Sequence, residues 1–246
     1  MICPEGQIQP PDAYFVTAAV DMTKLRQIGD CQMSYSRREP ILHMVPILDL
    51  RPTQMTVGMI EVRRKRKAWV VKRDEAKDAS LAAHMIPVVL GPSGERYITD
   101  HHHLTRALLE EGQKEVYVTV IGDLRKANSS YFWNLMNYHG WTHPFDQKGQ
   151  RCAYADLPKT IKGLEDDPYR SLSGALRNIG GYAKDATPFS EFVWADFFRP
   201  RFKRKDIARD FDAALNEAYA MAKAADADFL PGWCGPHDSD PPPRKA

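Results

Sequence analysis

Short apolar runs in the first half of the chain predict β-strands. Residues 45–50, 86–90 and 116–121 are apolar, and the last of these runs is rich in β-branched side chains, which favour strands. A Gly-Pro-Ser-Gly segment at 91–94 is typical of a turn. A further short strand is expected directly after it, at 96–99.

The pattern changes to a helical period at Asp100. Leu104, Ala107 and Leu108 fall on one stripe, and Gly112 is placed to end the helix in a left-handed conformation. Together with the strands on either side, residues 86–121 therefore predict the order strand, turn, strand, helix, strand. This order is typical of a compact α/β core in which a helix begins directly after a strand.

Helical patterns occur before this segment and dominate after residue 123. The sequence predicts helices at 57–75, capped by Thr56, and at 129–138, 157–164, 169–179, 191–198 and 206–225. Aromatic residues such as Phe132 and Trp194 need a surface on which to be buried. The predicted fold class is therefore α+β: an N-terminal extension (1–40), an α/β core (41–124), a helical region packed on that core (125–230) and a tail (231–246).

Composition narrows the class of protein without pointing to a partner. The 246 residues contain 34 basic and 32 acidic side chains, so a net charge of +2 argues neither for nor against nucleic acid. The four cysteines show no CxxC spacing, which excludes a zinc knuckle or thioredoxin motif. No apolar run approaches the ~20 residues of a membrane span. The first residues resemble no signal peptide, so a cytoplasmic protein is expected.

A histidine cluster marks the point where the strand at 96–99 meets the next helix. The run Asp100-His101-His102-His103 precedes a first helical turn whose N–H groups lack intrahelical partners and carry the positive end of the helix dipole. Such a turn is an anion site, most often for phosphate. We expect His101 and Arg106 to bind phosphate, the arginine reaching back from one turn into the helix.

The same cluster suits catalysis or metal binding. His102 or His103 can act as a general acid or base, with Asp100 orienting it. Neutral imidazoles also bind metals, so His101, His102 and His103 are candidate ligands for Mg, Mn or Zn. Neighbours on a helix diverge by ~100°, so all three cannot reach one ion. The alternative is a solvated turn in which Asp100 caps the helix.

Other histidines are weaker candidates. His139 and His143 form an H-x3-H pair and are possible accessory residues, within an aromatic-rich segment that is equally typical of a connector packed on the core. His43 and His84 are expected to be structural.

Two basic runs, at 63–67 and 199–205, suit either a phosphate backbone or a solvated helix face. Five consecutive cations on one helix spread around its axis, so weak, sequence-independent duplex binding is expected. Walker A, GxSxG and HExxH motifs are absent from the sequence.

The VPILDLRPTQ strand and the DHHH turn resemble the ParB/sulfiredoxin fold and, more closely, the ParB-like nuclease family. In that superfamily the turn reads GERRxRA in partition proteins, GCHR in sulfiredoxins and DGHHR in free-serine kinases. Asp100, His102 and His103 match the kinase pattern, whereas Arg106 matches the partition pattern. His101 stands in place of glycine, and His102 in place of the sulfiredoxin cysteine, which excludes sulfiredoxin activity. The resemblance implies a phosphate-binding turn, and the family name implies nuclease activity.

Three functions follow, in order of preference. The first is an enzyme that acts on a nucleotide, nucleic acid or phosphorylated metabolite by phosphoester hydrolysis or phosphoryl transfer, with a divalent metal as the expected cofactor. The second is a nucleotide-dependent DNA-binding module of the partition type. The third is a metal-dependent enzyme that uses the histidines without phosphate. No membrane partner is expected.

Overall fold

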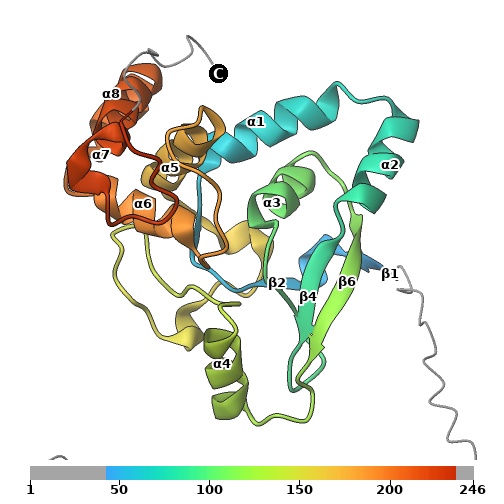
Figure 1. Ribbon diagram of the computed structural model, residues 1–246. Helices are drawn as coiled ribbons and strands as arrows, with labels where there is room; N and C mark the ends of the chain where they lie inside the picture. Colours follow the sequence, from blue (N-terminus) through green and yellow to red (C-terminus); the bar gives the residue numbers. More distant parts are fainter. Residues whose placement is uncertain (1–42, 237–246) are drawn as a thin grey trace, which may run out of the picture. The chain divides into compact units, whose positions relative to one another are not determined.

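The computed structural model describes residues 43–236 (Figure 1). The predicted N-terminal extension and the end of the predicted tail lie outside these residues. No helix in the part of the chain that the structure describes is long and apolar enough to cross a membrane.

A mixed five-stranded sheet forms the centre of the α/β part. Its strand order is β1-β6-β4-β5-β2. β6 pairs in parallel with β4 and antiparallel with β1, and β5 pairs antiparallel with β4 and in parallel with β2. The bounds are β1 (His43–Pro46), β2 (Leu50–Pro52), β4 (Ile86–Leu90), β5 (Arg96–Ile98) and β6 (Glu115–Asp123). These match the predicted strands, except that the run at 45–50 is divided by a 3-10 turn, η2 (Ile47–Asp49).

The single helix predicted at 57–75 is wrong. Thr56 does not cap a helix but lies in β3 (Thr56–Val57), a two-residue strand that pairs with β7 (Glu165–Asp166). Gly58 is the N-cap of α1 (Met59–Val70), and a separate helix, α2 (Asp74–Ala83), follows after a short turn. The β-branched pair at 56–57 explains the later start, because such residues favour extended backbone.

The helix predicted after Asp100 is confirmed as α3 (His102–Glu110). Gly112 has φ 78° and follows the helix as expected. Its N–H donates to the carbonyl of Leu109, and the N–H of Gln113 donates to the carbonyl of Leu108, which is the bonding pattern of a Schellman cap. Figure 1 shows α3 beside α1, with α2 at the far end of α1.

The C-terminal half is helical, with two departures from the prediction. Its helices are α4 (Ser129–Tyr138), α5 (Pro168–Asn178), α6 (Ser190–Phe198), α7 (Arg204–Arg209) and α8 (Phe211–Lys223). The predicted helix at 157–164 is wrong, since only the short turn η4 (Ile161–Gly163) forms there. The predicted helix at 206–225 is divided at Asp210, whose side chain accepts a hydrogen bond from Ala213 N and so caps α8.

The α/β part and the helical part each have their own apolar cluster. One lies between the sheet and α1 and α3. The other joins α5 to α8 and contains Trp194, Phe197 and Phe198, so these aromatic residues are buried among the helices instead of on the sheet. A small third cluster of Val89, Phe132 and Met136 packs α4 against β4. Where α1 contacts α5, the N–H of Ile60 donates to Oγ of Ser171 at 3.2 Å.

Candidate functional site

His101 holds the turn before α3 in an unusual conformation. Its φ of 63° and ψ of 21° lie in the left-handed region, which favours glycine. Its N–H donates to Oδ1 of Asp100 at 2.6 Å. The expectation that Asp100 caps α3 is wrong, because His101 is the N-cap residue and no side chain caps the helix.

His102 and His103 point into the protein. Nε2 of His102 accepts a hydrogen bond from Thr53 N at 3.2 Å, and Nε2 of His103 accepts one from Gly58 N at 2.9 Å. The two residues are only 4% and 9% exposed. They therefore anchor the start of α3 to the segment that connects β2 with α1.

These contacts fix the protonation of both rings. A ring nitrogen that accepts an N–H hydrogen bond carries no proton, and burial lowers the pKa of His102 far below 6.5 and that of His103 to about 4. Nε2 of His103 also lies 3.5 Å from a carboxylate oxygen of Glu61. Since that nitrogen accepts from Gly58, we treat the approach as a contact of a neutral ring rather than as a salt bridge.

The predicted metal ligands do not fit a shared ion. The Nε2 lone pairs of His102 and His103 are taken by backbone N–H groups, and a metal needs those lone pairs. Within residues 43–236, no group of three or more His, Cys, Asp or Glu side chains is arranged to hold a metal.

Arg106 does not reach back to the turn as expected. Its Nη1 donates to the carbonyl groups of Ile161, Lys162 and Leu164 at 3.2, 2.9 and 3.0 Å, and its Nε donates to Glu110 at 2.6 Å. The carbonyls at the end of the η4 turn are converging acceptors that the helix position of Arg106 can reach. This arginine joins α3 to the helical half.

A cavity of about 210 Å³ opens beside His101. It lies between α1, α2 and the start of α3. Imidazole, ammonium and hydroxyl groups line it together with the ring of Trp69 and the side chain of Leu104. The polar groups belong to Lys65, Lys72, Ser80, His84 and His101.

The polar groups in this α3 cavity are held by specific contacts. The rings of His84 and His101 lie 6.5 Å apart, edge to face. Nδ1 of His84 lies 2.9 Å from the carbonyl oxygen of Ser80, which can only accept, so Nδ1 carries the proton and Nε2 is available to a ligand. The ammonium of Lys72 donates to Ser80 Oγ at 2.6 Å. His84 was expected to be structural, but it contributes to this cavity.

Burial also affects His101. It lowers the pKa of His101 below 6.5, while the neighbouring Asp100 opposes the shift. The imidazole is therefore mainly neutral near pH 7 and can accept a proton. Among the predicted site residues, His101 lines the cavity, whereas His102, His103 and Arg106 connect the turn to other segments.

The accessory pair lies elsewhere. His139 and His143 border a separate hollow of about 350 Å³ next to Phe189. His139 stacks on Trp141 with ring centroids 4.2 Å apart, and His143 packs on Phe192 at 3.9 Å. Burial lowers the pKa of His143 to about 3, so this ring is neutral and packed among aromatic side chains.

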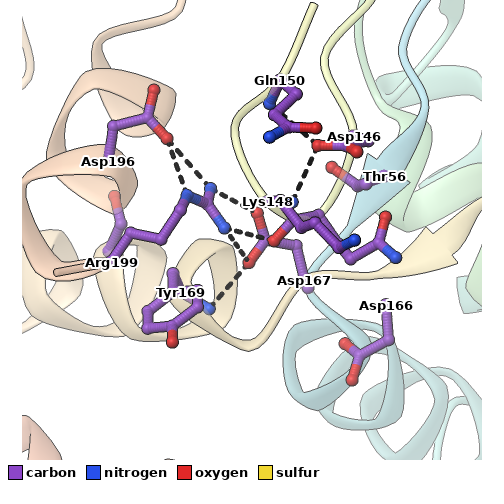
Figure 2. Close-up of polar contacts among 12 residues, drawn as sticks. Thr56, Asp146, Lys148, Gln150, Asp166, Asp167, Tyr169, Asp196 and Arg199 are labelled. Atoms are coloured by element: carbon purple, nitrogen blue, oxygen red, sulfur yellow. Dashed lines mark hydrogen bonds and ion pairs between the residues drawn. The ribbon is translucent and has the colours of Figure 1, made fainter. Parts of the chain in front are cut away.

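Two arginines outside the predicted site are central to the helical half: Arg199, which begins the second basic run, and Arg170, which no sequence pattern marked. Figure 2 shows Arg199 between Asp167 and Asp196. Its Nη2 donates to Oδ2 of Asp167 and to Oδ1 of Asp196, both at 2.9 Å. Asp167 also accepts from Tyr169 N at 3.0 Å as the N-cap of α5. The Asp-Pro pair at 167–168 is a helix-start signal from which this cap was predictable.

The other arginine is Arg170, which is 4% exposed. Its Nη2 lies 3.1 Å from Glu191, and its guanidinium carbon lies 3.7 Å from the centroid of the Phe192 ring. Its charge adds to burial in lowering the pKa of His102, His103 and His143.

The mixed sheet, the DHHH turn and the helical cover together define a ParB-like α+β protein. The sequence model of the family described as "Putative ParB-like nuclease" matches residues 43–200, and the chain belongs to this family. Among solved structures, protein Atu1540 from Agrobacterium tumefaciens is 46% identical, with a TM-score of 0.76 over 81% of this chain and 100% of that one. No curated protein matches.

Proposed function

We propose that the α3 cavity binds the phosphate group of a substrate and that the protein hydrolyses a phosphoester there. The observation that carries the proposal is the meeting of His84, His101, Lys65 and Lys72 around one cavity at the start of α3. The ammonium group of Lys72, that of Lys65, which also pairs with Glu61 at 3.4 Å, and a helix N-terminus favour an anion. The family description as a nuclease agrees with a phosphodiester substrate.

The two imidazoles suit acid–base chemistry on a bound phosphate. In the hydrolysis, the oxygen of a water molecule bonds to phosphorus while its proton passes to the neutral ring of His101. The bond from phosphorus to the leaving oxygen breaks, and His84, once Nε2 has taken up a proton from solvent, passes that proton to the leaving oxygen. Lys65 and Lys72 stabilise the charge that develops on the remaining oxygens. No metal ion takes part in this scheme.

The conformation of His101 supports a functional role. A side chain in the left-handed region costs roughly 1 kcal/mol relative to glycine. The turn is therefore strained by the imidazole at position 101, whereas glycine there would be unstrained. Backbone strain that a simpler residue would relieve is a reason to look for function at the same position.

His101→Gly is the decisive variant because it separates structure from function. Glycine relieves the strain, and its greater freedom in the unfolded chain offsets part of the gain. We therefore expect a free energy of unfolding equal to that of the wild type or about 1 kcal/mol higher. Hydrolysis of bis(p-nitrophenyl) phosphate and of short oligonucleotides should fall at least about a hundredfold.

Two lysines on α2 and its approach provide the matched control. Lys72→Met removes an ammonium from the cavity, whereas Lys77→Met removes one that pairs with Asp74 outside it. We expect phosphate binding, measured by calorimetry, to weaken about tenfold or more in Lys72→Met only. Equal loss in both variants, or full activity in His101→Gly, would refute the proposed site.

A further inference from the structure

A second cavity lies on the opposite side of α1 from the α3 cavity. It has a volume of about 380 Å³ and lies between α1, α5 and α8, and we call it the α1–α5–α8 groove. Its size is within the range of small-molecule sites, which is roughly 300–1,000 Å³. Its wall on α1 contains Arg63, Arg64 and Lys67 together with Glu61, whose carboxylate is paired with Lys65. Lys65 itself faces the α3 cavity.

The three cations on this wall form no ion pair with the acidic side chains around them. Lys65 lies 3.4 Å from Glu61, and Arg66 lies 2.8 Å from Glu110. Within residues 43–236, in contrast, Arg63, Arg64 and Lys67 are exposed and form no ion pair. The basic run therefore divides around the helix as its 100° spacing dictates, and its unpaired members share one groove.

The floor of the groove is apolar. Ile60 and Ala175 are half-buried, Phe211 presents an aromatic ring at the start of α8, and Leu215 is buried behind it. Inorganic phosphate alone would leave this apolar floor exposed to water. A flat ring system that covers the floor removes it from water, which favours binding.

The wall opposite the cations carries an amide and a carboxylate group. Asn178 on α5 and Asp212 on α8 are exposed at this edge. A carboxylate there repels a second anionic group, but it accepts hydrogen bonds from N–H groups, and the amide of Asn178 both donates and accepts. A fitting ligand is thus anionic at one end, flat and apolar in the middle, and rich in N–H donors at the other end.

We propose that the α1–α5–α8 groove binds a nucleotide. The phosphate lies against Arg63, Arg64 and Lys67, the base covers the floor beside Phe211, and its amino edge meets Asp212 and Asn178. Bases with an exocyclic amine are favoured over uracil. This site is separate from the α3 cavity, so it stands whether or not that cavity hydrolyses phosphoesters.

The test is calorimetric titration of the full chain with AMP, GMP, CMP and UMP, with adenosine and inorganic phosphate as partial ligands. The double variant Arg64→Ala, Lys67→Ala should weaken AMP binding about a hundredfold or more, because two charge-assisted contacts to the phosphate are lost. The control Lys126→Ala, Lys159→Ala removes the same charge from exposed sites outside the groove and should leave binding unchanged.

The His101→Gly variant distinguishes the two sites. AMP binding that survives in His101→Gly and disappears in Arg64→Ala, Lys67→Ala belongs to the groove. The proposal is overturned by equal binding in both double variants, by no AMP binding up to millimolar concentration, by UMP binding as tightly as AMP, or by adenosine or phosphate alone binding as tightly as AMP.

Discussion

The buried histidines should make the folded protein sensitive to mild acid. His102, His103 and His143 are neutral in the folded state because burial lowers their pKa, to about 4 for His103 and about 3 for His143. In the unfolded chain a histidine has a pKa near 6.5. Their contribution to stability is therefore complete above about pH 6.5 and is lost as the pH falls, because only the unfolded chain takes up protons.

The size of the effect follows from these values. Each proton taken up on unfolding costs about 1.36 kcal/mol per pH unit. For His103, a difference of about 2.5 pH units gives roughly 3 kcal/mol lost by pH 4. Between about pH 6 and pH 5, where carboxylates still titrate little, three such histidines together lower the free energy of unfolding by roughly 3–4 kcal/mol.

His103→Gln isolates one of these groups. The Oε1 atom of glutamine can accept the hydrogen bond from Gly58 N, but the side chain does not titrate. Near pH 8 we expect the free energy of unfolding to be about 1–3 kcal/mol lower than in the wild type, because the hydrogen-bond geometry is imperfect. The loss of stability between about pH 6 and pH 5 should be smaller than in the wild type by roughly 1 kcal/mol.

Urea unfolding followed by tryptophan fluorescence at each pH measures both quantities. Ile98→Val is the control, because it shortens a fully buried side chain at a cost of about 0.5–1.5 kcal/mol without removing a titratable group. It should shift the whole pH curve and keep its slope. A slope in His103→Gln equal to that of the wild type would refute the assignment of a buried, neutral His103.

Three further substitutions test contacts that join the two halves or hold the helical half together. Arg106→Lys keeps the charge but cannot reach all three carbonyl groups at the η4 turn, so we expect a loss of about 1–3 kcal/mol in urea unfolding and unchanged phosphate affinity; weaker phosphate binding would contradict this. Gly58→Ala places Cβ 2.6 Å from Oγ of Ser171 and 2.7 Å from its backbone nitrogen, so the melting temperature should fall, and an unchanged value would contradict the close approach. Arg199→Met leaves the carboxylate of Asp167 buried without its partner at a cost of about 3–5 kcal/mol, and adding Asp167→Asn should recover part of it; strict additivity of the two changes would contradict the pairing.

The sequence predicted those parts of the fold that depend on local patterns. The β-branched run at 116–121, the helix stripe of Leu104 and Leu108, and the left-handed glycine after α3 are local signals, and the structure confirms them. The prediction of a helix at 157–164 was wrong because Pro158 and Gly163 interrupt the segment, which forms only turns. Residues 56–57 became a strand because they pair with residues far along the chain.

The candidate site was predictable in position but not in its division of roles. The turn was identified from its sequence, whereas the direction of each side chain depends on segments distant in sequence. Thr53 and Gly58 supply the N–H groups that draw His102 and His103 inward. Lys72 and His84 reach the cavity only because an unpredicted helix, α2, follows α1.

The three consecutive histidines therefore divide into one outer imidazole and two inner ones. Neighbouring helix positions diverge by ~100°, so a run at a helix start sends its side chains in different directions. The left-handed backbone of His101 exposes that imidazole to the α3 cavity, while the next two rings are fixed inside by backbone N–H groups. Arg170 keeps these inner rings neutral together with burial. The inner pair thus holds rigid the turn that positions the outer imidazole, which is what a site needs if one side chain is to meet a ligand in a fixed orientation.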